Sequence, residues 1–417
     1  MGGSTHGAQS PAIGDLPADL LVSVVHHLDS TSRGVAKHGC RGLRDAICIS
    51  QLAGGCSSTM ELSRVSENLA LLSWAASSGC PVSKKKSWQR KVSRMASARG
   101  NLEVLKWLLS KGFFFDEWDL QLSARHGHLH VLRFLRALGI ELGTGAAAEA
   151  ASSGHLQVLQ WLRAEGCPWG VMACARAAAN GHLPTLMWAR SQGCPWNVET
   201  CLRAAAGGHF AVLRWAHDNG CPWNEATCSG AAASNNMEML QFARRECCPW
   251  DEATCREAAR NGNFAMLEWA RAKGCPWDES TCSAAAAGGH LKLLQWARLQ
   301  GCPWDSSVST NAAHHGHTNV LHWALGHGCP QSAAICPAAA YRGHLGVLKW
   351  AQAHGLSCDA GCCSAAARGG HLEVLQWLRA VGCPWDERTC QAAEDGGHSS
   401  LLEWARRNGC PEYLHED

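Results

Sequence analysis

The chain has 417 residues, of which 17% are charged, and a formal net charge of +2. This balance argues against a dedicated nucleic-acid-binding protein, because such proteins concentrate Lys and Arg on one face. The unusual counts are 24 Cys, 20 Trp and 43 Gly beside only 2 Tyr and 7 Phe. A motif repeated many times explains this bias, and no run of about 18 apolar residues predicts a membrane span.

Residues 1–13 are predicted to be disordered, and they lack the charged start and apolar core of a secretory signal. We therefore expect an intracellular protein that is cytoplasmic, nuclear or both. In such a reducing compartment the cysteines are expected to be thiols rather than disulfides.

Residues 14–48 carry apolar side chains at helical spacing behind Pro17, a residue suited to the first turn of a helix. One interpretation is a capping helix, because the first member of a repeat array otherwise exposes its apolar face. Residues 49–66 are predicted to be a linker or a further capping helix.

The same N-terminal segment is similar to an F-box in its Leu16-Pro17 opening, its Asp19-Leu20-Leu21 and Leu28-Asp29 pairs, and the later Cys40-Arg41 and Leu43-Arg44. Arg33 and Gly34 depart from the family pattern, which is usually apolar there. The resemblance implies docking to a Skp-type adaptor of a cullin-RING ubiquitin ligase. The residues that would make this contact are Leu16, Pro17, Leu20, Leu21, Val24 and Leu28.

Residues 67–417 are built from about 13 repeats with a period of 27 residues. The segment that begins GHLEVLQWLRAVGCPWDERTC at Gly370 recurs with small changes from Gly289 and from Gly154. An insertion of six residues near 84–91 separates the first repeat from the second. Its Lys and Arg residues predict either a solvated loop or a nuclear-import or acidic-partner patch.

Each repeat is predicted to form two short antiparallel helices. Asp278, like Asp251, Asp386, Asn197 and Asn224 in other repeats, follows Pro-Trp and can cap the first helix. That helix, rich in Ala and Cys, ends at Gly288-Gly289, because glycine adopts the left-handed backbone easily. The second helix, Leu291 to Gln300, carries Leu291, Leu294 and Ala297 on one stripe.

The repeat resembles an ankyrin repeat in the order of its Thr, Ala, Gly-His-Leu, Leu and Gly residues, as at Thr281, Ala285, Gly289, Leu294 and Gly301. It departs from the family in its 27-residue length, against the usual 33, and in replacing the Pro-Leu-His turn. The resemblance implies an all-α, ankyrin-like helical repeat solenoid that binds proteins. The shortened turn implies loss of most of the binding surface that the tips of the β-hairpins form in ankyrin repeats.

The recurrent Cys and Gly-His residues could in principle form a metal-binding array. Repetition in register favours structural roles instead: Cys as a small buried hydrophobe, His as a hydrogen-bonding residue at the turn, and the second-helix Trp as core. The turn Trp residues either cover the next repeat or form an exposed ridge. No metal, no cofactor and no enzymatic activity are expected, since no catalytic motif occurs.

Binding specificity is expected where a repeat departs from its consensus, because Arg and Tyr are frequent interface anchors. His314 is one such departure on a first helix. The candidates for target binding are Arg176, Arg203, Arg256, Arg260, Tyr341, Arg342 and Arg368. Together with the F-box-like segment, they predict a substrate-recruiting subunit of a ubiquitin ligase; the alternative is a scaffold with no ligase role.

Overall fold

A computed structural model describes residues 86–411, with side chains from residue 89 onward, and these residues form 24 α-helices and no strand. The chain divides into two compact units, residues 1–196 and 197–417, which are described separately. The described helices of the first unit are α6 (Lys86–Arg99), α7 (Leu102–Ser110), α8 (Glu117–Arg125), α9 (Leu129–Ala137), α10 (Thr144–Ser152), α11 (Leu156–Ala164), α12 (Val171–Ala179) and α13 (Leu183–Ser191).

The second unit continues the same pattern of helix pairs. Its helices are α14 (Val198–Ala206), α15 (Phe210–Asp218), α16 (Glu225–Ala233), α17 (Met237–Arg245), α18 (Glu252–Arg260), α19 (Phe264–Ala272), α20 (Glu279–Ala287), α21 (Leu291–Leu299), α22 (Ser306–His314), α23 (Thr318–Gly326), α24 (Ile335–Tyr341), α25 (Leu345–Ala353), α26 (Ala360–Gly369), α27 (Leu372–Ala380), α28 (Glu387–Asp395) and α29 (Ser399–Arg407). Even-numbered helices are the first helices of the repeats, and odd-numbered helices are the second.

The predicted helix boundaries are confirmed at both ends of the first helix. The Asp278 side chain accepts a hydrogen bond from the Ser280 N–H (3.1 Å), which satisfies an N–H that the helix leaves unpaired. Gly289 lies in the left-handed region with φ +73°. Two of the predicted caps are wrong: Asn224 and Asp386 occupy the capping position without bonding a helix N–H, and Asp386 instead pairs with Arg388 (2.8 Å).

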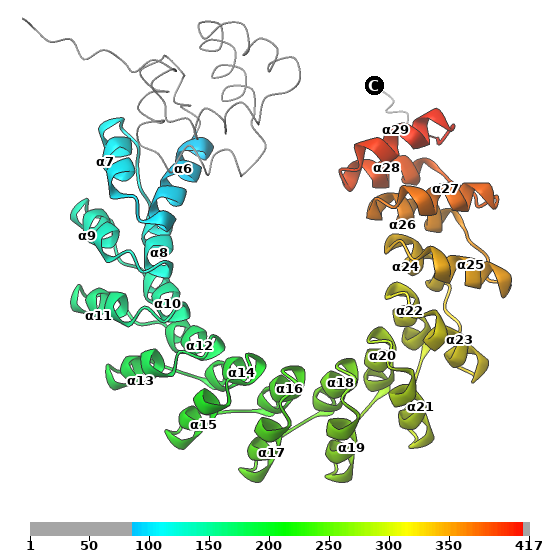
Figure 1. Ribbon diagram of the computed structural model, residues 1–417, viewed down its shortest axis with the longest axis horizontal. Coiled ribbons are helices and arrows are strands. Elements are labelled where there is room, and N and C mark those ends of the chain that lie inside the picture. The colour runs from blue at the N-terminus through cyan, green and yellow to red at the C-terminus, as the bar shows by residue number, and fades with distance from the viewer. Residues whose placement is uncertain (1–85, 412–417) are drawn as a thin grey trace, which may run out of the picture. The chain divides into compact units, whose positions relative to one another are not determined.

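Within each unit the first helices pack closely against one another, while the second helices contact each other only weakly. Figure 1 accordingly shows the even-numbered helices on the inner side of each unit's curve. We call the surface of these first helices the concave face. The close approach needs small side chains: a Cβ on Gly230 would lie 3.1 Å from the Ala206 backbone nitrogen.

The core of a repeat combines Ala and Cys from the first helix with Leu and Ala from the second. Helices of nine residues are too short to be stable alone, so this shared burial holds them. The predicted stripe of the second helix needs one correction. Leu293, Leu294 and Ala297 are buried, whereas Leu291, next to the turn, is only partly buried.

Two elements differ from the predicted repeat. The loop predicted at 84–91 is wrong for residues 86–91, because they form the start of α6, whose 14 residues exceed the nine of most first helices. Helix α24 has only seven residues, since the segment before it lacks the Trp-Asp pair, and Ala334 occupies the N-cap without a side-chain bond.

Candidate protein-interaction surface

Several Gly-His histidines join their repeat to the one before it. His317 Nε2 lies 3.0 Å from the Ala287 carbonyl oxygen, at the last residue of the preceding first helix. Because a carbonyl only accepts, Nε2 carries the proton and donates it. His290, His344 and His398 make the same contact with Arg260, His314 and Arg368. The predicted structural role is thus found, but its partner lies in the neighbouring repeat.

The turn Trp residues are half-buried between two repeats. The Arg271 guanidinium carbon lies 4.0 Å from the centre of the Trp277 ring, which packs edge-on against Trp296 at 6.0 Å. Arg271 also donates to the Cys275 carbonyl oxygen. Equivalent Arg–Trp pairs are Arg163–Trp169, Arg190–Trp196, Arg244–Trp250, Arg298–Trp304 and Arg379–Trp385. These Trp residues therefore cover a neighbouring repeat and do not form an exposed ridge.

Most of the described cysteines are buried, and several form close pairs of a first-helix thiol and a turn thiol. The Sγ atoms of Cys363 and Cys383 lie 3.7 Å apart, and Cys302 Sγ lies 3.4 Å from the Asp278 carbonyl oxygen. Burial, followed by the thiol of Cys390, raises the pKa of Cys410 to about 12. The Cys410 thiol therefore stays protonated and unreactive at neutral pH. Within residues 86–411 no group of three or more His, Cys, Asp or Glu side chains is placed to hold a metal ion.

One predicted target-binding residue, Arg176, lies in the first unit, on α12. Its guanidinium pairs with Glu149 of α10, and Glu149 also lies 4.0 Å from Arg125 of α8. The Glu149 side chain is thus placed between cations from two neighbouring repeats. This cluster was not predicted, because the sequence pattern of one repeat does not show which residues of its neighbours lie alongside.

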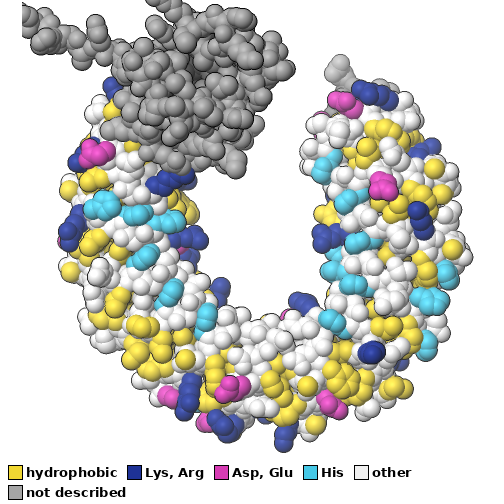
Figure 2. Space-filling model, in the orientation of Figure 1, with side chains coloured by type: hydrophobic (Ala, Val, Ile, Leu, Met, Phe, Trp, Pro, Cys, Tyr) yellow, Lys and Arg dark blue, Asp and Glu magenta, His cyan; other side chains and the backbone are white. Residues whose placement is uncertain are grey.

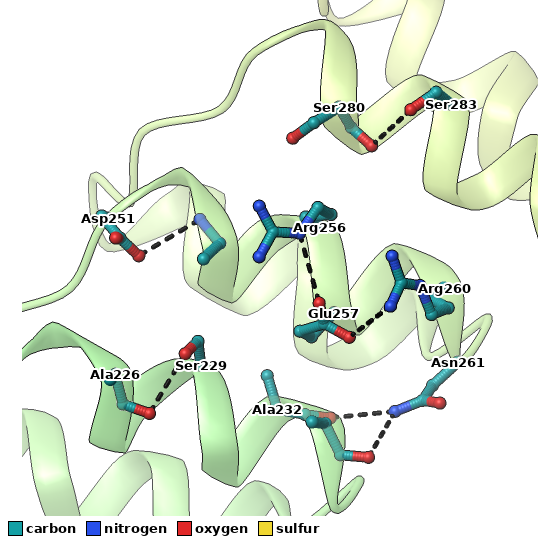
Figure 3. A network of polar contacts seen from close by, with 12 residues as sticks. Ala226, Ser229, Ala232, Asp251, Arg256, Glu257, Arg260, Asn261, Ser280 and Ser283 are labelled. Atoms are coloured by element: carbon teal, nitrogen blue, oxygen red, sulfur yellow. Dashed lines mark hydrogen bonds and ion pairs between the residues drawn. The ribbon is translucent and has the colours of Figure 1, made fainter. Parts of the chain in front are cut away.

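The remaining predicted residues lie on or directly after first helices of the second unit. Arg256 and Arg260 flank Glu257 on α18, at 3.2 Å and 3.4 Å (Figure 3). Arg203 pairs with Glu199 at 2.8 Å, and Arg368 lies 3.8 Å from Asp395. Their positive charges are therefore partly neutralised within the protein.

Tyr341 and Arg342 differ from these arginines in having no acidic partner among the described residues. Both are exposed at the end of α24, and the ring of Tyr341 stacks on His314 of α22 with centroids 6.5 Å apart. Figure 2 shows His and Lys or Arg side chains along the even-numbered helices of this unit. The candidate residues Leu16, Pro17, Leu20, Leu21, Val24 and Leu28 lie outside the described residues.

The protein is an all-helical repeat solenoid whose first helices present a surface of small side chains with scattered cations. No helix in the described range is both long and apolar enough to cross a membrane. A family model described as ankyrin repeats (many copies) matches residues 94–136. No curated protein matches the chain.

Solved repeat proteins match the chain only at low similarity. One is the pentatricopeptide repeat protein PPR10 in complex with an 18-nucleotide psaJ RNA element, with 15% identity, 94% of this chain and 67% of that chain covered, and a TM-score of 0.38. PPR10 from maize matches at 15% identity over 95% and 68%, with a TM-score of 0.36. The ankyrin repeat domain of human ASB11 matches at 16% identity over 37% and 83%, with a TM-score of 0.32.

Proposed function

We propose that the solenoid is a non-catalytic module that binds a protein target on the concave face. The observation that carries this proposal is that two kinds of side chain within a repeat have different roles. Side chains that recur in register, such as His317, Arg271 and Trp277, hold repeats together. Those that depart from the consensus, such as Tyr341 and Arg342, are exposed on the first helices or directly after them. Variable exposed positions on a rigid scaffold are where interaction proteins place their specificity.

The concave face also carries small side chains, which leave room for a protein segment. The side chains of Ala226 and Ser229 on α16 and of Ser280 and Ser283 on α20 are small and only partly buried. A partner chain can therefore approach the helix backbones closely. Tyr and Arg at the margin supply the large side chains that anchor most interfaces.

Site-specific photo-crosslinking tests this proposal in the full chain. A benzophenone side chain is placed at Ser283 on α20 or, as the matched control, at the exposed Lys292 on α21 of the same repeat. We expect specific protein adducts from position 283 and not from 292. Adducts that form only from position 292 would place the partner on the opposite side and contradict the proposal.

We further propose that residues 14–48 dock to a Skp-type adaptor, so that the protein recruits its target to a cullin-RING ubiquitin ligase. The support is the Leu16-Pro17 opening with Leu20, Leu21 and Leu28 at helical spacing. The alternative is a scaffold in which this segment only caps the array.

A pull-down with the adaptor separates the two roles. Wild-type protein should retain the adaptor, and the double variant Leu20→Asp, Leu21→Asp should lose it while keeping the helical circular dichroism of the repeats. If both proteins retain equally little adaptor, the ligase role is wrong and the scaffold role remains.

A further inference from the structure

The chain contains no Asp or Glu between Ser306 and Cys358. Over the same residues it contains Arg342, Lys349 and seven histidines. This stretch forms α22 to α25, which are two consecutive repeats of the second unit. On α18, by contrast, Glu257 neutralises its neighbouring arginines. It is the longest stretch without Asp or Glu within residues 86–411, so an anion meets no carboxylate on these four helices.

Five side chains of this stretch come together at the C-terminal ends of α22 and α24. We call His314, His315, Tyr341, Arg342 and His344 the basic patch. The rings of His314 and His315 have centroids 4.7 Å apart, and Tyr341 stacks on His314 with an interplanar angle of 19°. His344 Nε2 lies 3.1 Å from the His314 carbonyl oxygen. These contacts fix the spacing of the patch across two repeats.

The Arg342 guanidinium is exposed and has no ion-pair partner within residues 86–411. Helix ends of this kind usually present carbonyl oxygens, which repel anions. Here the His344 Nε2–H donates to one of those carbonyls and reduces that repulsion. With the proton on Nε2, the ring nitrogen Nδ1 of His344 is unprotonated and can accept a hydrogen bond.

The positive character of the patch also affects its histidines. Burial, followed by His315, Arg342 and His344, lowers the pKa of His314. Burial likewise lowers the pKa of His344, with Arg342, His315 and His317 contributing. A carboxylate bound among these groups would compensate their mutual repulsion.

We propose that the basic patch binds an acidic segment of a partner protein. Arg342 is the main contact for the carboxylates of this segment, and Tyr341 packs against its backbone. This inference rests on the proposed function, because it names the chemistry of a partner on the concave face. Charge complementarity selects the occupant: the patch offers one permanent cation, Arg342, together with hydrogen-bonding side chains and no carboxylate.

An acidic protein segment fits the patch better than a nucleic acid does. Nucleic-acid binding depends on many Lys and Arg contacts with successive phosphates. The patch has one permanent cation, Arg342, since the nearest further arginine on a first helix, Arg368, lies 3.8 Å from Asp395. A few carboxylates spaced along an extended peptide match one arginine and neighbouring histidines.

The test measures binding of a fluorescein-labelled peptide of ten glutamates to the full chain by fluorescence anisotropy at low salt. The variant is Arg342→Gln, and the matched control is Lys349→Gln, which removes one exposed positive charge from α25 of the same repeat. We expect Arg342→Gln to weaken binding three- to tenfold, as the loss of one charge-assisted contact predicts, and Lys349→Gln to weaken it less than twofold.

Equal losses for the two variants, or no peptide binding by the wild type at low salt, would overturn the proposal. A ten-nucleotide single-stranded RNA that binds more tightly than the peptide, and that loses affinity in Arg342→Gln, would overturn it in favour of nucleic acid. Failure here is distinguishable from failure of the proposed function, because protein adducts from position 283 do not depend on Arg342.

Discussion

Two glycines of one repeat should respond differently to the same substitution. Gly289 and Gly301 both have a left-handed backbone, with φ of +73° and +81°. A Cβ on Gly289 would lie 2.7 Å from the His317 ring, whereas a Cβ on Gly301 would meet no atom within 4 Å. Gly301→Ala should therefore cost about 1 kcal/mol of unfolding free energy, from the backbone conformation alone.

Gly289→Ala should cost more, because the new methyl group displaces the His317 ring and breaks its 3.0 Å hydrogen bond to the Ala287 carbonyl oxygen. A lost hydrogen bond of this kind adds about 0.5–1.5 kcal/mol, and the collision adds to it, so about 2–3 kcal/mol is expected in total. Urea unfolding followed by Trp fluorescence measures the difference. Hydrogen exchange in α20 and α21 localises it, since repeat arrays need not unfold in one step.

A double-mutant cycle tests the cause of the difference. If the His317 ring is responsible, His317→Ala should destabilise the wild type by about 1 kcal/mol and should cost little in the Gly289→Ala background. Gly208 supplies a natural control, because the next repeat has Asn236 in place of this histidine and a Cβ on Gly208 would lie 3.7 Å from Ser234. Equal costs at Gly289 and Gly301, or strictly additive effects of the two changes, would refute the reasoning.

Four further substitutions test other parts of the repeats. Thr281→Val should raise the unfolding free energy by about 1 kcal/mol, because the buried Thr281 hydroxyl has no hydrogen-bond partner. Ser309→Ala should lower it, since the Ser309 hydroxyl donates to nearby carbonyls; urea midpoints compare the two. Cys247→Gly should stabilise the chain by about 1 kcal/mol, because Cys247 holds φ +61° where the other repeats have Gly; an unchanged urea midpoint would contradict this. Burial raises the pKa of Asp119 from 3.8 to about 6, so the folded state binds the extra proton and the stability of α8 should fall by about 2–3 kcal/mol as pH rises from 4 to 7. Hydrogen exchange in α8 against pH should show this slope in the wild type and lose it in Asp119→Asn.

Much of the local structure of a repeat could be predicted from the sequence, because its signals lie within a few residues. The Asp278 cap and the left-handed Gly289 follow from residue type and position. The helical start of the insertion could not be predicted in the same way. Residues 86–91 form an N-terminal extension of α6, the first helix of its repeat. Their Lys and Arg content alone is equally compatible with a loop.

The contacts between repeats were less predictable, for a physical reason. Sequence periodicity shows that His317 occupies a fixed place in its own repeat, but not that its acceptor is the carbonyl of Ala287, 30 residues earlier. The packing of Trp277 against Trp296 of α21 depends in the same way on the distance and rotation between neighbouring helices. Only the packed array supplies those quantities.

These inter-repeat contacts also explain why the concave face can vary. The Gly-His contact uses backbone carbonyls as acceptors, so the side chain at the end of the first helix is not constrained by it. Arg260, Ala287 and His314 all accept the same bond while presenting different side chains. The last position of a first helix can therefore change without loosening the stack. An acid-free group of histidines, Tyr341 and Arg342 can thus arise at consecutive repeats at little cost in stability, which is the property expected of a surface that selects a partner.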